Sequence, residues 1–183
     1  MAITHSASIP LGTACPDFAL PCTAGHTHSL ESFSKSPWLV VIFMCNHCPY
    51  VIPVLDKLVD LQHEYKEKGV QLVTICSNDA QTYPADSFEN MKALAETKAF
   101  PFPYLYDESQ AIAKAFDATC TPDIFVYDKN RKLAYHGRIN DIERGENPAT
   151  TNDLEEALIQ LLEKGTCTGE VRPSVGCNIK WKQ

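Results

Sequence analysis

The sequence changes from an apolar run to a pair of cysteines in the stretch Val40-Val41-Ile42-Phe43-Met44-Cys45-Asn46-His47-Cys48-Pro49-Tyr50. The apolar run is typical of a strand that is buried on both faces, and a helical pattern begins at the cysteines. Two cysteines separated by two residues at a helix start can close a disulfide with little movement. We expect the first sulfur to face solvent and its pKa to be lowered by the helix N-terminus. The stretch therefore predicts a reversible dithiol/disulfide site.

The chain has eight cysteines, which are many for a cytosolic protein and too few for a disulfide-stapled scaffold of 183 residues. We interpret most of them as small buried or surface thiols. Only the C-x-x-C spacing of Cys45 and Cys48 stands out. The same pair could form half of a zinc site, although a structural zinc usually needs two more ligands at comparable spacing.

The segments around this stretch predict alternating strands and helices. The apolar spacing from Cys45 to Lys68 indicates a helix that Pro53 should kink and Gly69 should end. The other expected elements are a hairpin of 17–20 and 27–30 around Gly25, strands at 38–44, 70–75 and 102–106, helices at 86–98 and 108–116, a hairpin of 123–127 and 132–137, and a helix at 151–162. This order predicts an α/β fold with helices on both faces of a mixed sheet.

Length and composition indicate one soluble domain over residues 1–183, with a polar tail at 165–183. The formal net charge of -7 argues against nucleic acid or an anionic membrane as a partner. The longest apolar run is too short to span a bilayer, and the N-terminus lacks the pattern of a signal peptide. We therefore expect a cytoplasmic protein. The oligomeric state is not predicted by the sequence.

Residues 10 to 164 resemble the thioredoxin fold, in particular the peroxiredoxin-like and TlpA/ResA-like branch of AhpC/TSA-type redoxins. The resemblance is carried by the C-x-x-C pair between strand and helix, Pro53 five residues after Cys48, Thr121-Pro122 before a hairpin, the opening Cys15-Pro16-Asp17-Phe18-Ala19-Leu20, and the segments 45–51 and 176–181. It implies a three-layer α/β/α fold with a mixed central sheet and an N-terminal hairpin extension. The resemblance also implies that the protein is a thiol-disulfide oxidoreductase.

The resemblance assigns the central roles to Cys45 and Cys48. Cys45 would attack a substrate disulfide, and Cys48 would resolve the mixed disulfide and release the reduced substrate. His47 resembles the histidine of the C-P-H-C motif in the DsbA family and would stabilise the Cys45 thiolate. Asn46 offers an amide donor in place of the rigid proline of that motif.

Thr121-Pro122 would abut the two sulfurs through a cis peptide bond, as in thioredoxins. Thr121 would then offer backbone hydrogen bonds to an extended substrate. Cys120 and Cys177 are candidates for a third redox thiol, with a small buried residue as the alternative for Cys120. The remaining thiols are interpreted as structural: Cys15, Cys22, Cys76 and Cys167.

The sequence departs from its relatives at three positions. Thioredoxins carry a buried Asp six residues before the first cysteine, where this chain has Leu39, so another group or water must accept the proton. If Cys48 matches the peroxidatic cysteine of peroxiredoxins, Val41 and Cys45 replace their Pro and Thr. The hydrogen bonds that polarise a peroxide are then missing, and fast peroxide reduction by that route is not expected.

Two other functions are compatible with the sequence beside that of a dithiol oxidoreductase. The first is a thiol-dependent peroxidase, in which Cys48 or Cys45 forms a sulfenic acid that its neighbour condenses to a disulfide. The second is a Sco-like copper protein, for which His136 is the candidate third ligand. For the leading function we expect no cofactor and no resident metal. We expect a thioredoxin- or glutathione-type reductant, and a disulfide or peroxide as the substrate.

Overall fold

The computed structural model describes residues 3–142, 144–145 and 147–183. Their strands and α-helices follow one another, in chain order, as β1 (Ile3–His5), β2 (Ala19–Pro21), β3 (Thr27–Ser29), β4 (Trp38–Phe43), α1 (Leu55–Tyr65), β5 (Val70–Cys76), α2 (Phe88–Thr97), β6 (Tyr104–Tyr106), α3 (Ala111–Ala115), β7 (Cys120–Thr121), β8 (Asp123–Tyr127), β9 (Leu133–His136), α4 (Asp153–Lys164) and β10 (Val175–Asn178). Short 3-10 turns lie at Leu30–Phe33, Ile52–Val54, Lys66–Lys68 and Pro84–Asp86.

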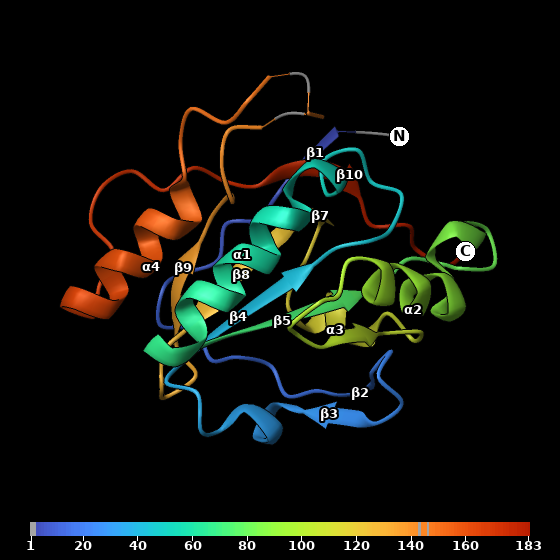
Figure 1. Ribbon diagram of the computed structural model, residues 1–183, viewed down its shortest axis with the longest axis horizontal. Coiled ribbons are helices and arrows are strands. Elements are labelled where there is room, and N and C mark those ends of the chain that lie inside the picture. Colours follow the sequence, from blue (N-terminus) through green and yellow to red (C-terminus); the bar gives the residue numbers. More distant parts are fainter. Residues whose placement is uncertain (1–2, 143, 146) are drawn as a thin grey trace.

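The central sheet has the strand order β6-β5-β4-β8-β9 (Figure 1). β4 pairs in parallel with β5 and antiparallel with β8, so the sheet is mixed as the sequence predicts. The expected N-terminal hairpin is also confirmed, with β2 antiparallel to β3. The carboxyl end of β4 thus meets the start of β8 at one edge, where Phe43 lies opposite Asp123.

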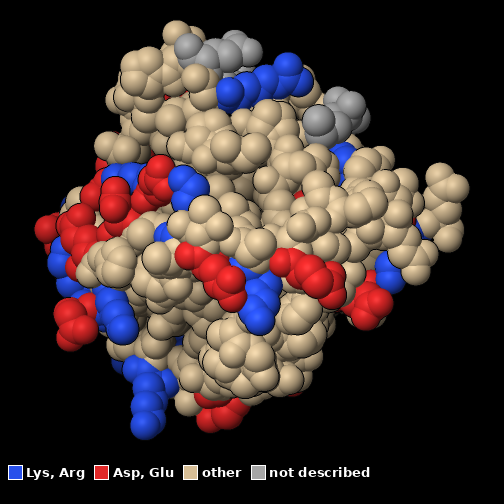
Figure 2. Space-filling model, turned by 45° about the vertical axis from the view of Figure 1, so that its right-hand side comes forward, with Lys and Arg blue, Asp and Glu red and all other residues tan. Residues whose placement is uncertain are grey.

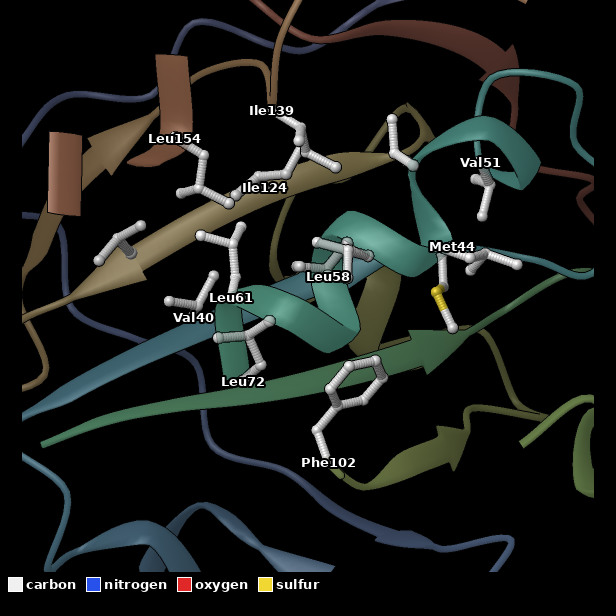
Figure 3. Close-up of a cluster of buried hydrophobic side chains, with 14 of the residues drawn as sticks. Val40, Met44, Val51, Leu58, Leu61, Leu72, Phe102, Ile124, Ile139 and Leu154 are labelled. Atoms are coloured by element: carbon white, nitrogen blue, oxygen red, sulfur yellow. The ribbon is translucent and has the colours of Figure 1, made fainter. Parts of the chain in front are cut away.

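Alternate residues of the strands face opposite layers, as the pleat of a sheet requires. On β4, Val40 and Ile42 pack with α1, α2 and α4, whereas Leu39, Val41 and Phe43 pack with α3 and the N-terminal segment. The predicted three-layer arrangement is therefore confirmed. Figure 3 shows the first of these clusters, in which strand residues meet helix residues: Val40, Leu72, Ile124, Leu58, Leu61 and Leu154.

The expected helix start at the cysteines is wrong. α1 begins only at Leu55, after a turn in which the carbonyl of Cys48 accepts from the backbone N–H of Val51 (2.9 Å). Pro53 lacks the N–H that would bond to the carbonyl of Pro49, so an α-helix cannot run back to the cysteines. The two thiols therefore precede the helix, and its N-terminus does not lie at Cys45 as the sequence predicts.

The expected polar tail at 165–183 is also wrong in part. It contains β10, which lies between β1 and β7 in a second, antiparallel sheet. Gly176 permits this close approach, because a Cβ there would lie 2.0 Å from the carbonyl oxygen of Thr121. The C-terminal segment is consequently packed against the loop that precedes β8.

The surface carries charges of both signs. On the face drawn in Figure 2, acidic and basic side chains lie next to one another over its left and lower parts, and the upper part carries few charges. Within the described residues, no helix is long and apolar enough to cross a membrane.

Candidate active site

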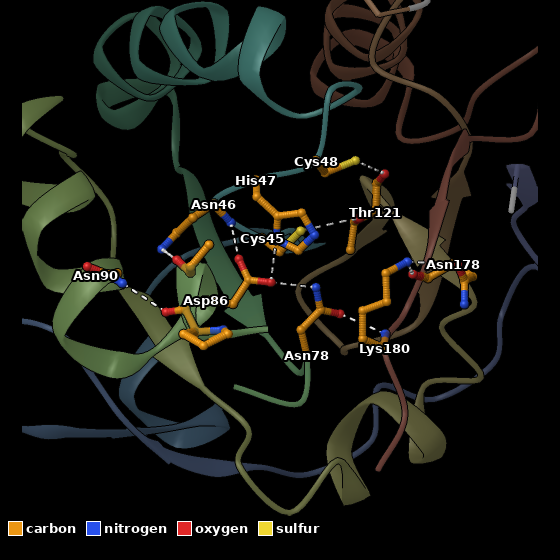
Figure 4. Close-up of polar contacts among 12 residues, drawn as sticks. Cys45, Asn46, His47, Cys48, Asn78, Asp86, Asn90, Thr121, Asn178 and Lys180 are labelled. Carbon is orange, nitrogen blue, oxygen red and sulfur yellow. Dashed lines mark hydrogen bonds and ion pairs between the residues drawn. The ribbon is translucent and has the colours of Figure 1, made fainter. Parts of the chain in front are cut away.

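The two cysteines of the C-x-x-C motif lie beyond the carboxyl end of β4, against the loop that joins β7 to β8 (Figure 4). The Thr121–Pro122 peptide bond in this loop is cis, as the resemblance implies. The Cys48 thiol donates to the carbonyl oxygen of Thr121 at 3.1 Å, and the Cys45 sulfur lies 3.7 Å from the Thr121 hydroxyl. The structure thus brings Cys45, Cys48, Thr121 and Pro122 together.

Cys48 has the more acidic of the two thiols. A hydrogen bond from Cys45 lowers the pKa of Cys48 to about 5, and bonds from Thr121 and Cys177 act in the same direction against the effect of burial. Hydrogen bonds from Cys45, Thr121 and Cys177 thus favour the Cys48 thiolate, whereas the Thr121 carbonyl oxygen at 3.1 Å favours its thiol. The thiolate is the nucleophilic form of cysteine, so Cys48 has the properties of an attacking group.

Cys45 differs from the sequence-based expectation. Neither sulfur of the motif faces solvent, because Cys45 is 1% exposed and Cys48 is 0% exposed. The hydrogen bond to Cys48 raises the pKa of Cys45 well above the usual value, and burial and the nearby Asp86 carboxylate raise it further. These surroundings act against the expected lowering of the Cys45 pKa.

The low pKa of Cys48 predicts the pH dependence of the reduced protein. Because the pKa is depressed, the thiolate should persist as the pH falls from neutrality and be half lost near pH 5. The ultraviolet absorbance of the thiolate, followed during acid titration, measures this step. The same titration of Cys48→Ser should show no such step. A wild-type step near pH 9 would contradict the assignment.

A buried carboxylate lies beneath the motif. Asp86 has no solvent exposure, and its two oxygens accept from the backbone N–H of Asn46 and from the Asn78 amide, each at 2.8 Å (Figure 4). The Nδ1 atom of His47 also lies 2.8 Å from this carboxylate. Asp86 is therefore a charged group beside Cys45, although it comes from the loop after β5 and not from β4.

The side chains between the two cysteines are held in place. Asn46 donates to the carbonyl oxygen of Ala85 at 2.8 Å and accepts from the Tyr104 hydroxyl at 3.0 Å. The His47 ring stacks on Tyr83 with ring centroids 5.8 Å apart. Both residues thus fix the motif to the segment around Asp86.

The same group has the spacing of a metal site. The ligand atoms of Cys45, His47 and Asp86 all lie within 4.8 Å of one another, and no other such group occurs among the described residues. These donor types suit zinc or another divalent transition metal. His136 does not join them, because its Nε2 atom lies 2.9 Å from Asp123 and its ring stacks on Phe125. The third ligand of the Sco-like hypothesis is therefore engaged elsewhere.

The two candidate third thiols have different surroundings. Cys177 on β10 is paired with Thr121 on β7, whose carbonyl oxygen accepts from the Cys48 thiol at 3.1 Å. The Cys120 thiol lies 3.5 Å from the carbonyl oxygen of Pro122, and burial raises its pKa above the usual value. Thr121 was expected to pair with an extended substrate, but β10 already pairs with it. In this structure β10 occupies that place, and the pairing of Thr121 with a substrate stays a prediction.

Residues 11–136 match the model of the AhpC/TSA family. The chain belongs to this family. Chloroplastic peroxiredoxin Q of Triticum aestivum is 26% identical over 103 residues, which cover 56% of this chain and 44% of that protein. The chain thus spans less than half of this relative.

Solved structures place this AhpC/TSA member in the thioredoxin fold. An uncharacterized conserved protein of Geobacillus kaustophilus is 44% identical to this chain and has a TM-score of 0.94. The match covers 100% of this chain and 97% of that protein. The thioredoxin domain of a thiol-disulfide oxidoreductase of Bacteroides vulgatus is 17% identical and has a TM-score of 0.60. This match covers 70% of this chain and 89% of that domain. The fold expected from the sequence is confirmed, and the chain is a redoxin.

Sequence reasoning missed two parts of this redoxin site. The sequence analysis assigns Asp86 no role at the site, whereas its carboxylate accepts from the backbone N–H of Asn46 in the motif. Arg144 was not considered, and its guanidinium lies 5.6 Å from the centre of the Tyr50 ring and lowers the pKa of Cys177. The missing Asp at position 39 was the available signal, because it required another proton acceptor near the pair.

Proposed function

We propose that this redoxin is a thiol-disulfide oxidoreductase that cycles between the Cys45/Cys48 dithiol and the Cys45–Cys48 disulfide. The observation that carries the proposal is the hydrogen-bonded thiol pair beside a cis-proline, with the pKa of Cys48 lowered and that of Cys45 raised. Cys48 is then a nucleophilic thiolate at neutral pH, and Cys45 remains protonated until the second step.

The first step is attack by the Cys48 thiolate on a sulfur of the substrate disulfide. A Cys48–substrate disulfide forms, the substrate disulfide breaks, and the leaving thiolate takes a proton from solvent. The donors from Cys45, Thr121 and Cys177 then lose their negative partner. Once Cys48 is neutral, its hydrogen bond with Cys45 no longer raises the pKa of Cys45.

The second step is attack by Cys45 on the Cys48 sulfur. Cys45 passes its proton to the leaving substrate thiolate, and the ligand atoms of His47 and Asp86 lie within 4.8 Å of the Cys45 sulfur. The Cys45–Cys48 disulfide forms and the second substrate thiol leaves, so the substrate gains two electrons and two protons in all. A thioredoxin- or glutathione-type dithiol returns the enzyme to its reduced form, which suits a reducing compartment such as the cytoplasm.

A disulfide map tests this cycle. Reduced protein is mixed with one equivalent of hydroxyethyl disulfide, in the presence of a chelator, and remaining thiols are alkylated in acid before mass spectrometry. We expect the wild type to lose two thiols, to gain the Cys45–Cys48 bond and to release two equivalents of mercaptoethanol. Cys48→Ser should release none. An unreacted wild-type protein would exclude the proposed function.

A thiol-dependent peroxidase is the second candidate, because the pKa of Cys48 is lowered and Cys48 is the residue that would align with the peroxidatic cysteine. Val41 and Cys45 still replace the Pro and Thr of that motif. We therefore expect hydrogen peroxide to react with the reduced protein no faster than with an ordinary free thiolate. Stopped-flow fluorescence measures the rate, and a fast phase that is absent in Cys48→Ser would favour the peroxidase.

A further inference from the structure

β10 occupies the edge of the site at which an extended substrate would pair. Its Cys177 lies opposite Thr121, and Asn178 lies opposite Cys120. Addition of an extended strand beside another is a common way of binding peptides. Here the strand belongs to the chain itself, and it carries a cysteine at the position that faces the dithiol.

Cys48 is the middle member of three neighbouring thiols. Its thiol donates to the carbonyl oxygen of Thr121 at 3.1 Å, and Thr121 pairs with Cys177 on β10. The Cys45 sulfur lies 3.7 Å from the hydroxyl of the same Thr121. Cys177 is 3% exposed, so bulk solvent does not separate its sulfur from that of Cys48. An oxidised Cys48 therefore has two neighbouring thiols, Cys45 and Cys177, that can attack its sulfur.

The segment that follows Cys177 holds it in this place. The backbone N–H of Lys180 donates to the Asn78 side chain at 2.9 Å, and the carbonyl of Lys180 accepts from the Gln110 amide at 2.8 Å. Because Asn78 also donates to Asp86, one hydrogen-bonded chain connects β10 with the buried carboxylate below the motif. The position of Cys177 is thus built into the site.

The charges around Cys177 favour its reaction after Cys48 has been oxidised. Burial raises the pKa of Cys177 to about 12, and the hydrogen bond and charge of Cys48 contribute to this rise, while Lys180 and Arg144 lower it. Conversion of Cys48 to a neutral disulfide removes its charge and leaves the two cations. The Cys177 thiolate becomes easier to form at that stage.

We propose that Cys177 is a third redox-active residue, which resolves oxidised Cys48 by forming a Cys48–Cys177 disulfide before Cys45 replaces it. The proposal rests on the proposed function, because it needs a Cys48 that reacts with disulfides. The reacting groups are the three neighbouring thiols, and the strand that carries Cys177 stands where a protein substrate would bind. The cycle then serves small disulfides that need no strand pairing.

The steps balance without a further reactant. The Cys177 thiolate attacks the Cys48 sulfur of the mixed disulfide, which breaks the bond to the substrate and releases a substrate thiolate. The Cys45 thiol then attacks the Cys48 sulfur, the Cys48–Cys177 bond breaks, and the proton of Cys45 passes to the departing Cys177 thiolate. The second exchange moves the disulfide and transfers no net electrons.

The test uses the full chain with Cys45→Ser, which removes the second exchange. After one equivalent of hydroxyethyl disulfide and alkylation in acid, we expect the Cys48–Cys177 peptide and full release of mercaptoethanol. Cys45→Ser/Cys177→Ser should instead keep one mercaptoethanol on Cys48. Cys45→Ser/Cys120→Ser is the matched control, because Cys120 is a buried thiol of the neighbouring strand, and it should still form the Cys48–Cys177 bond.

The outcomes separate this proposal from the proposed function. A stable mercaptoethanol adduct on Cys48 in Cys45→Ser, with Cys177 recovered as an alkylated thiol, would overturn the role of Cys177 and leave the dithiol cycle standing. No adduct or disulfide in any variant, the wild type included, would overturn both. Since the decisive variant keeps the native Cys177, the result does not depend on how a substitution in β10 folds.

Discussion

Cys48→Ser is expected to lower the rate constant for reduction of a small disulfide by at least about a thousandfold. The serine hydroxyl has no anionic form at neutral pH, whereas Cys48 has its pKa lowered to about 5. The remaining thiol of the motif cannot substitute, because hydrogen bonding, burial and the Asp86 carboxylate raise the pKa of Cys45. Release of mercaptoethanol from hydroxyethyl disulfide, under steady reduction, measures the effect.

Cys45→Ser is the matched control for this prediction. It leaves the Cys48 nucleophile in place and keeps a hydroxyl donor beside it, so the first release of mercaptoethanol should remain within about tenfold of wild type. Complete loss of this first release in Cys45→Ser, with normal release in Cys48→Ser, would reverse the roles. The attacking thiol would then be Cys45, as the sequence resemblance implies.

Asp86→Ala is expected to lower the free energy of unfolding by about 3 kcal/mol, because it leaves two donors without their charged acceptor. The N–H of Asn46 and the amide of Asn78 both bond to this carboxylate, which has no solvent exposure. Chemical denaturation of the reduced protein measures the loss. Removal of the carboxylate should also lower the pKa of Cys45, since Asp86 contributes to its rise.

Asp56→Ala provides the comparison for a carboxylate at the surface. Asp56 pairs with Lys98 at 2.8 Å, but its side chain is 77% exposed. An exposed pair of this kind contributes little to stability. If both alanine variants unfold at the same denaturant concentration, Asp86 does not hold the motif as the structure indicates.

The central fold was predictable because its signals are local. The apolar run at 38–43 and the alternation of strands and helices predicted the mixed sheet. The helix start was placed too early because apolar spacing continued through Pro49 and Pro53, whose effect on backbone hydrogen bonds outweighed the pattern. β10 was missed because four residues without clear alternation pair with a strand that is distant in sequence.

The candidate site was predictable only where a motif marked it. Cys45, Cys48 and Thr121 were expected together from the resemblance, and the structure places them in contact. Asp86 lies in a 3-10 turn far along the chain, and no spacing rule connects it with the cysteines. The relative acidity of Cys45 and Cys48 depends on hydrogen-bond donors and burial that arise only when distant segments come together in the folded chain. No local pattern in the sequence indicates it.

The position of β10 has a consequence for synthesis of the protein. The five strands of the central sheet lie between residues 38 and 136, so a ribosome completes them before it makes Val175–Asn178. Chains fold as they emerge, from the N-terminus onward. The motif and Thr121 can therefore assemble while β10 is still absent, and the nascent chain presents an uncovered dithiol. Covering of this dithiol therefore follows synthesis of the central sheet.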